Sequence, residues 1–295
     1  MTARIDAHHH LWDLAARPQP WMTGAPMAPL RRNFGVADLV AAVAGRQIDG
    51  TVVVQTVTDV TESEELLDLA QQQPHIAGVV GYVDVAAADV GEQLDSLLER
   101  PSGGQLVGIR SMVQYETDPD WLSRPQVLGG LRAVAARSLV HDLLILPHQI
   151  DAAVAAVAAV PEGRFVIDHL AKPNIAGGAW EPWAGDIAAL ARYDNVSAKL
   201  SGLVTEAEWT SWTVDDLRPY VDHALAIFGP QRLMFGSDWP VCTVAATYEQ
   251  VVESMSQLTS ALSPAEQLAV FGGTATTIYS LTERIAPSNH HLEPP

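Results

Sequence analysis

Thr51-Val52-Val53-Val54-Gln55 is the stretch of sequence that decides the fold. Its run of β-branched residues is typical of a strand that is buried on both faces. Such strands belong to parallel sheets, whose two faces are covered by helices. Helix-like periodicity lies on both sides of the stretch, over residues 36–43 and 62–73. The stretch and its flanks therefore predict an α/β fold.

The same alternation of strand and helix extends in both directions from this stretch. Strands are predicted at residues 4–7, 51–55, 76–82, 106–110, 142–146, 164–168, 196–199 and 233–235. Helices are predicted at residues 36–43, 62–73, up to about 99, 126–137, 150–160, 183–192, 215–228 and 247–262. Ser263-Pro264-Ala265-Glu266 has the pattern of a helix start and predicts an extra C-terminal helix.

Eight strands separated by helices, with no break in composition, predict a single TIM-like (β/α)8 barrel, regular or distorted, over residues 1–285. A doubly wound open sheet is the alternative, but it calls for a glycine-rich phosphate turn that the sequence lacks. A long loop with four prolines, residues 13–33, follows the first strand. Residues 286–295 are expected to form a polar tail.

Composition limits the partners. The 295 residues are 48% hydrophobic and carry a formal net charge of -18, which argues against binding to nucleic acid or to an anionic membrane. The single cysteine, Cys242, excludes an internal disulfide and a multi-cysteine metal site. No run of 18 apolar residues and no leader-like segment occurs, so we expect a cytoplasmic protein, with a homo-oligomer left open.

The first strand leads into three consecutive histidines within Arg4-Ile5-Asp6-Ala7-His8-His9-His10-Leu11-Trp12-Asp13. Side chains alternate along a strand, so His8 and His10 share one face and His9 points to the other. Two imidazoles on one face can bind a metal ion or clamp a substrate group. The apolar setting of this short run argues against the remnant of a purification tag.

Polar residues recur where the other predicted strands end, and in barrels these positions carry the chemistry. They are Gln55, Tyr82, Asp84, Arg110, Gln114, His148, Asp168, His169, Lys172, Lys199, Ser201 and Asp238. Strands one and eight become neighbours when a barrel closes, so Asp238 should lie beside His8 and His10. Histidines with a carboxylate can hold Zn²⁺ and leave a position open for water. The carboxylate can also act alone as a general base.

Four blocks of sequence carry a family resemblance. They are Asp6-Ala7-His8-His9-His10-Leu11-Trp12-Asp13, Asp168-His169-Leu170-Ala171-Lys172-Pro173, Lys199-Leu200-Ser201-Gly202-Leu203 and Phe235-Gly236-Ser237-Asp238-Trp239-Pro240. In this order they resemble the amidohydrolase superfamily, and most of all its lactonase branch, which acts on L-fuconolactone, L-rhamnonolactone and 2-pyrone-4,6-dicarboxylate. The resemblance spans about residues 4–280.

The resemblance implies a (β/α)8 barrel with Asp238 and His169 as catalytic residues. It implies His8, His10, His169 and Asp238 as ligands of one divalent metal ion, zinc if any, although some members of this branch work without metal. Members with two metals carry a lysine on the fourth strand and a histidine on the fifth, where this sequence has Arg110 and, at best, His148. Ser111 stands where sugar-lactone members often have histidine.

The resulting hypothesis is a hydrolase that opens a lactone of a sugar acid, with Asp238 as general base. Arg110 offers a planar cation for a carboxylate or for polyol oxygens. The other candidates for substrate binding, each with a structural role as the alternative, are Gln55, Gln114, Lys172, Lys199, Trp12 and Trp239. Competing functions are a lactonase for a pyrone dicarboxylate or muconolactone, a decarboxylase of the same superfamily, and a non-catalytic sugar-acid binding protein.

Overall fold

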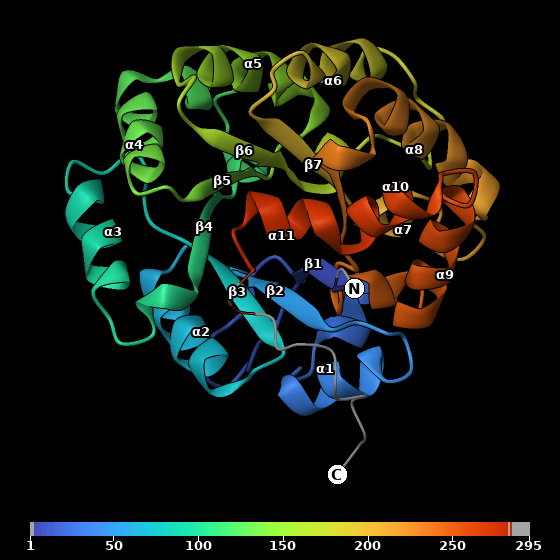
Figure 1. The fold of residues 1–295 in the computed structure, drawn as a ribbon, viewed down its shortest axis with the longest axis horizontal. Helices are drawn as coiled ribbons and strands as arrows, with labels where there is room; N and C mark the ends of the chain where they lie inside the picture. Colours follow the sequence, from blue (N-terminus) through green and yellow to red (C-terminus); the bar gives the residue numbers. More distant parts are fainter. Residues whose placement is uncertain (1–2, 283, 285–295) are drawn as a thin grey trace.

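The computed structural model describes residues 3–282 and residue 284, and its eight parallel strands form a barrel surrounded by helices (Figure 1). The strands are β1 (Ile5–His9), β2 (Gly50–Val54), β3 (Ile76–Gly81), β4 (Leu106–Ser111), β5 (Val140–Leu143), β6 (Arg164–Ile167), β7 (Val196–Leu200) and β8 (Leu233–Phe235). They are hydrogen-bonded in chain order from β1 to β8. The predicted (β/α)8 fold is confirmed.

The helices follow the predicted order. They are α1 (Val36–Val43), α2 (Val60–Gln72), α3 (Val90–Leu98), α4 (Pro125–Ala136), α5 (Ile150–Ala159), α6 (Trp183–Ala191), α7 (Leu203–Glu206), α8 (Val214–Phe228), α9 (Tyr248–Leu258), α10 (Pro264–Leu268) and α11 (Thr274–Ile278). The Ser263 side chain caps α10, and Glu266 bonds back to the Ser263 amide as its sequence pattern predicted. The short α7 was not predicted.

The barrel closes between β1 and β8 through the backbone. The Asp238 amide donates to the His8 carbonyl at 2.8 Å, and the His10 amide donates to the Trp239 carbonyl at 2.7 Å. Strand β8 itself ends three residues before Asp238, so the seam runs beyond the regular strand. The two segments expected to carry the chemistry are therefore joined directly.

The barrel interior is packed mainly with small and β-branched side chains. The end of the barrel formed by the amino ends of the strands is closed by α11. In Figure 1, α11 lies across the middle of the ring of strands. The interior cluster is formed by Ile5, Ala7, Val52, Val54, Ala77, Val80, Val107, Val140, Val166, Met234, Ala275, Tyr279 and Leu281. A second, larger core lies between the strands and the outer helices. Space for a ligand is therefore left at the opposite, carboxyl end.

The predicted fifth strand, 142–146, was placed too late in the chain. Strand β5 spans Val140–Leu143 and pairs Asp142 with Arg110 of β4. The polar pair His141-Asp142 interrupts an apolar run, so the sequence pattern favoured the apolar residues after it. Asp142 therefore lies within the barrel wall, whereas His148 is exposed in a 3-10 turn after the strand.

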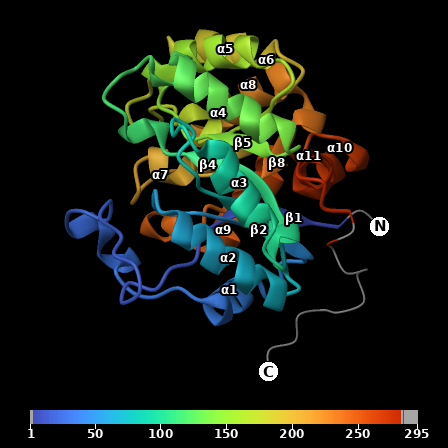
Figure 2. The same ribbon diagram turned by 90° about the vertical axis from the view of Figure 1, so that its left-hand side faces the viewer.

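The long loop after β1 is anchored at both ends. The backbones of Trp12 and Phe34 exchange two hydrogen bonds of 3.0 Å. Between them the chain makes an excursion that includes a 3-10 segment, Ala25–Leu30, seen in blue on the side of the barrel opposite α10 and α11 (Figure 2). The loop therefore reaches over the carboxyl ends of the strands.

The expected polar tail, residues 286–295, lies outside the described residues. Among the helices that are described, none has the length and apolar character needed to cross a bilayer.

Buried His141 generates a stability prediction. Neither ring nitrogen has a hydrogen-bond partner among the described residues. Burial lowers the pKa of His141 to about 4, although the negative charge of Asp168 acts to raise it. The unfolded chain then binds more protons than the folded one between pH 4 and 6.5, so stability rises with pH in that window. We expect His141→Phe to increase the free energy of unfolding by about 1–2 kcal/mol at pH 5.

Urea unfolding of the wild type and the variant at pH 5 and at pH 8 measures this effect. The advantage of the variant should shrink towards pH 8, where His141 is neutral in both states. An equal difference at both pH values would contradict the role given to this histidine.

Candidate active site

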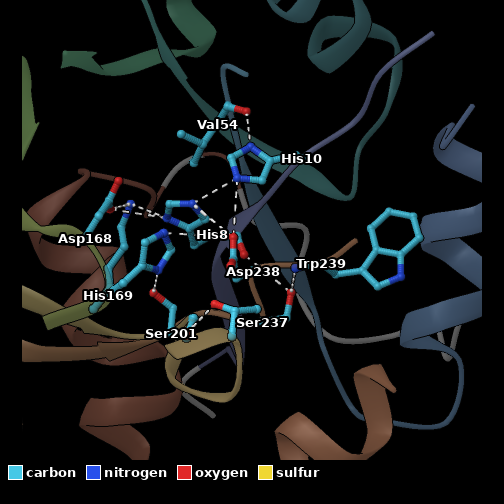
Figure 3. A network of polar contacts seen from close by, with 12 residues as sticks. His8, His10, Val54, Asp168, His169, Ser201, Ser237, Asp238 and Trp239 are labelled. Atoms are coloured by element: carbon cyan, nitrogen blue, oxygen red, sulfur yellow. Dashed lines mark hydrogen bonds and ion pairs between the residues drawn. The ribbon is translucent and has the colours of Figure 1, made fainter. Parts of the chain in front are cut away.

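The four residues expected at the centre meet at the carboxyl end of the barrel (Figure 3). The rings of His8 and His10 are turned to the same point, with 3.2 Å between their Nε2 atoms. His9 points the other way and bonds to Thr51 at 2.9 Å, as the strand alternation predicted. Asp238 faces the two histidines from the chain after β8. Its Oδ1 lies 3.5 Å from His10 Nε2 and 3.8 Å from His8 Nε2.

His169 completes the group from an unusual backbone. Its Nε2 lies 3.9 Å from Asp238 Oδ1. Residues His169 to Lys172 all have positive φ, between 50° and 58°, and Asp238 has φ of 56°. A left-handed conformation costs roughly 1–2 kcal/mol per non-glycine residue, and such strain is concentrated at functional sites. Because the turn after β6 coils tightly, it presents both His169 and Lys172 to the same cavity.

Neighbouring groups fix the orientation of two rings. His10 Nδ1 lies 2.7 Å from the Val54 carbonyl, an acceptor, so this nitrogen carries the proton and the lone pair of Nε2 faces Asp238. His169 Nδ1 contacts the Ser201 hydroxyl at 2.8 Å. Gly202 follows with φ of 65°, and a Cβ there would lie 2.5 Å from His169 Nδ1. Only glycine leaves room for this ring.

A buried group of charges stands behind His8. His8 Nδ1 lies 3.3 Å from Asp168 Oδ1 and 3.1 Å from the Lys199 ammonium. Lys199 also contacts Asp142 at 2.5 Å and Asp168 at 3.0 Å, and Arg110 contacts the second oxygen of Asp168 at 3.1 Å. The three donors of the ammonium thus face three groups, two carboxylates and one imidazole. From the closed end of the barrel, the Tyr279 hydroxyl reaches Asp142 at 2.9 Å.

The environment sets the charges of the site. Burial raises the pKa of Asp238, but the neighbouring His169 and His10 outweigh burial and bring the pKa below its ordinary value. Burial lowers the pKa of His169 to about 4 and brings that of His8 well below its usual range. Asp168 has a pKa well below the ordinary value, because Lys199 and His8 overcome the effect of burial. At neutral pH the centre therefore combines an ionised Asp238 with neutral His8 and His169.

A cavity of about 200 Å³ opens over this centre. Its polar lining is His10, Thr56, Arg110, Gln114, Tyr115, His169, Lys172, Thr205, Glu206 and Asp238. Its apolar lining is Trp21, Met27, Met112, Leu144, Trp209, Val241 and Val244. A small site with an apolar wall and convergent polar groups suits a compact polar ligand.

The residues expected to bind substrate fall into two sets. Arg110, Gln114 and Lys172 line the cavity. Gln55 lies behind Arg110 and accepts from its guanidinium at 3.2 Å, and Lys199 is fully buried in the charge cluster. These last two support the wall rather than face the ligand.

Both expected tryptophans lie away from the cavity. Trp239 packs its ring on Phe34, with centroids 5.4 Å apart, and Trp12 packs on the same phenylalanine at 5.2 Å. Trp12 Nε1 also donates to the Arg32 carbonyl at 2.8 Å. They anchor the long loop to the barrel, while the aromatic lining comes from Trp21 of that loop, Tyr115 after β4 and Trp209 after α7. Ser111 is buried outside the lining, because it alternates with Arg110 on β4.

Sequence reasoning missed three polar partners. Asp142 was hidden by the misplaced strand, and Tyr279 and Glu206 lie on segments that gave no signal for the site. Asp168 was recognised as a polar residue at a strand end but received no role.

The donor set fits a divalent metal ion. Atoms bound at 2.0–2.1 Å to one tetrahedral zinc ion lie about 3.3 Å apart. The separations among His8 Nε2, His10 Nε2 and Asp238 Oδ1 are 3.2, 3.5 and 3.8 Å. The Val54 carbonyl behind His10 is the type of partner that orients a metal-binding imidazole. His8, His10 and Asp238 would hold the ion, with His169 at its side.

A parallel (β/α)8 barrel with histidines and a carboxylate at the carboxyl ends of its strands is the arrangement of a barrel hydrolase. The sequence model of the Amidohydrolase family matches residues 5–281, and the chain belongs to that family. The resemblance drawn from the four sequence blocks is confirmed.

Individual proteins similar to the chain agree with this result. The chain is 37% identical over 287 residues to L-fucono-1,5-lactonase from Burkholderia ambifaria, covering 95% of this chain and 97% of that protein. It is 23% identical to L-rhamnono-gamma-lactonase from Scheffersomyces stipitis, covering 82% and 86%. The crystal structure of an amidohydrolase from Burkholderia multivorans with bound zinc superposes with a TM-score of 0.88 at 35% identity, covering 94% of this chain and 99% of that one.

The close fit of Gly202 against His169 gives a second stability prediction. We expect Gly202→Ala to lower the free energy of unfolding by about 2–4 kcal/mol, because a left-handed alanine is strained and its methyl group meets the ring. Gly104→Ala is the matched control, since a Cβ there has no atom within 4 Å.

Urea unfolding of the two variants and the wild type compares them directly. Gly104→Ala should change the free energy of unfolding by less than about 0.5 kcal/mol. Equal stabilities of the two variants would show that the contact with His169 is not constraining.

Proposed function

We propose that this protein hydrolyses the lactone of a sugar acid. The observation that carries the proposal is the ionised Asp238 held among three histidine rings at the floor of a small polar cavity. The relatives named for L-fucono-1,5-lactone and L-rhamnono-gamma-lactone support the same reaction class.

In the proposed reaction, the Asp238 carboxylate takes a proton from a water molecule as the oxygen of that water adds to the lactone carbonyl. The carbonyl oxygen becomes an oxyanion, which donors on the neighbouring rings and Arg110 can stabilise; one such donor is worth ~3 kcal/mol. The bond to the ring oxygen then breaks, and protonated Asp238 returns its proton to the leaving alkoxide. The product is an open hydroxy acid, and Asp238 is ionised again.

We also propose that the site takes one divalent ion, zinc, on His8, His10 and Asp238. When bound, the ion supplies Lewis-acid polarisation of the carbonyl. The zinc in the crystal structure from Burkholderia multivorans supports this proposal. The protein's own residues still position the lactone and move the protons.

The charges of the cavity favour an uncharged lactone. Two permanent cations, Arg110 and Lys172, are among the residues described as lining it. Arg110 is paired with Asp168 at 3.1 Å, and Lys172 with Glu206 at 3.7 Å. A pyrone dicarboxylate, a muconolactone and the acid substrate of a decarboxylase each bring a carboxylate that would compete with Asp168 or Glu206. A neutral sugar lactone brings only hydroxyl and ester oxygens.

Asp238→Asn tests the general base. The amide keeps the size of the side chain but cannot take the proton, so we expect kcat for an accepted aldonolactone to fall by at least about 10³-fold. A pH-indicator assay over a panel of aldonolactones measures turnover, and circular dichroism verifies the fold. Asp215→Asn, whose side chain is 87% exposed, is the control for loss of one carboxylate. Turnover within tenfold of wild type would refute the role of Asp238.

Metal binding is tested independently of activity. We expect calorimetric titration of the chelator-treated protein to give one equivalent of Zn²⁺, and His10→Ala to lower the affinity at least about 10-fold by removing a ligand. His148→Ala, at an exposed position outside the centre, should keep the wild-type affinity. Equal affinities of wild type and His10→Ala would place the ion elsewhere.

A further inference from the structure

Lys172 and Glu206 face each other across one wall of the cavity, and the proposed reaction uses neither. Lys172 comes from the left-handed turn after β6, and Glu206 ends α7. Their side chains are 22% and 23% exposed, and both line the cavity over Asp238. The sequence drew attention to Lys172 but not to Glu206.

The spacing of the pair leaves it open to a ligand. Lys172 Nζ and Glu206 Oε1 are 3.7 Å apart, which is longer than a direct N–H···O hydrogen bond. An ammonium has three donors and a carboxylate has about four acceptor positions, so one loose contact satisfies neither group. A group that both donates and accepts could bond to the two at once.

The neighbouring polar groups on this wall are already satisfied internally. The Thr205 hydroxyl donates to the Gly202 carbonyl at 2.6 Å, and Trp209 Nε1 donates to the Thr205 carbonyl at 2.8 Å. The Trp209 ring therefore contributes an apolar surface beside a pair with unused hydrogen-bonding capacity.

The electrostatics of the pair suit a neutral ligand. Burial raises the pKa of Glu206, and Lys172 counters that effect. The two opposite charges cancel at a distance, so the pair offers hydrogen bonds without attracting a net charge. A hydroxyl group is the small function that donates to the carboxylate and accepts from the ammonium.

We infer that Lys172 and Glu206 form a hydroxyl-binding subsite that selects lactones bearing a ring hydroxyl at this wall. The inference rests on the proposed lactone hydrolysis and adds to it the residues that read the substrate. A lactone without that hydroxyl leaves the charged pair desolvated and unbonded. Sites of this kind reject analogues that lack the group they bond.

The experiment pairs each protein with a series of lactones. Wild type, Glu206→Gln and Lys172→Met are assayed with a six-membered aldonolactone and with its analogues that lack one ring hydroxyl each. We expect Glu206→Gln to lower kcat/KM for the parent lactone by about 10- to 100-fold. For the wild type, kcat/KM should fall by a similar factor on the one analogue that lacks the bound hydroxyl. On that analogue, kcat/KM of Glu206→Gln should be less than about threefold below that of the wild type.

Non-additivity between one side chain and one hydroxyl identifies their contact, because a purely structural loss would lower activity on every lactone equally. Glu208→Gln is the matched control. Glu208 is exposed two residues further along the chain, and its substitution removes the same charge. It should keep the wild-type kcat/KM throughout. Lys172→Met repeats the measurement from the other side of the pair if Glu206→Gln fails to fold.

The outcomes separate the two levels of the proposal. Fully additive losses for both variants on every analogue would overturn the subsite and leave lactone hydrolysis intact. A wild-type protein that opens no lactone of the series would overturn the proposed function, and the subsite with it.

Discussion

The buried carboxylate of Asp6 holds the first and last strands of the barrel together. It accepts hydrogen bonds from the amide and hydroxyl of Ser237 at 2.8 and 2.6 Å and from the Tyr248 hydroxyl at 3.1 Å. Burial raises the pKa of Asp6 to about 6, although these hydrogen bonds act to lower it. Because the contact lies directly beside His8 and Asp238, it reinforces the backbone closure of the barrel and helps to fix the separation of the reacting groups.

Lys199 provides the second constraint. An ammonium and two carboxylates buried in a barrel wall carry a large desolvation cost, and well-packed apolar residues often stabilise a fold as well or better. The role of these charges lies in their contact with His8, since Lys199 and Asp168 both lie against its Nδ1 atom. A donor and an acceptor both stand at that nitrogen, so the cluster can support either neutral tautomer of the ring. One tautomer presents a lone pair to a metal ion at Nε2, and the other presents an N–H to a developing oxyanion.

Much of the fold could be predicted from the sequence because its signals are local. Runs such as Val52-Val53-Val54 define buried strands without any knowledge of their neighbours. The four central residues could also be predicted, since strand ends converge in a barrel. The sequence could not show which aromatic residues line the cavity. Trp12 and Trp21 pack against each other, and only the path of the long loop decides that Trp21 and not Trp12 reaches the cavity. Asp142 was missed because the predicted strand began two residues too late, which placed Asp142 at its amino end, away from the carboxyl end where the reacting groups were expected.

The contact between Tyr279 and Asp142 has a consequence for synthesis of the chain. The charges beneath His8 receive their last hydroxyl partner only when α11 has packed against the barrel, and Asp6 meets Ser237 only across 231 residues of sequence. A nascent chain on the ribosome that has produced seven strands still lacks Asp238 and one side of the seam. The reaction centre is therefore assembled late, because a partial barrel of seven strands still lacks the carboxylate that the proposed reaction needs.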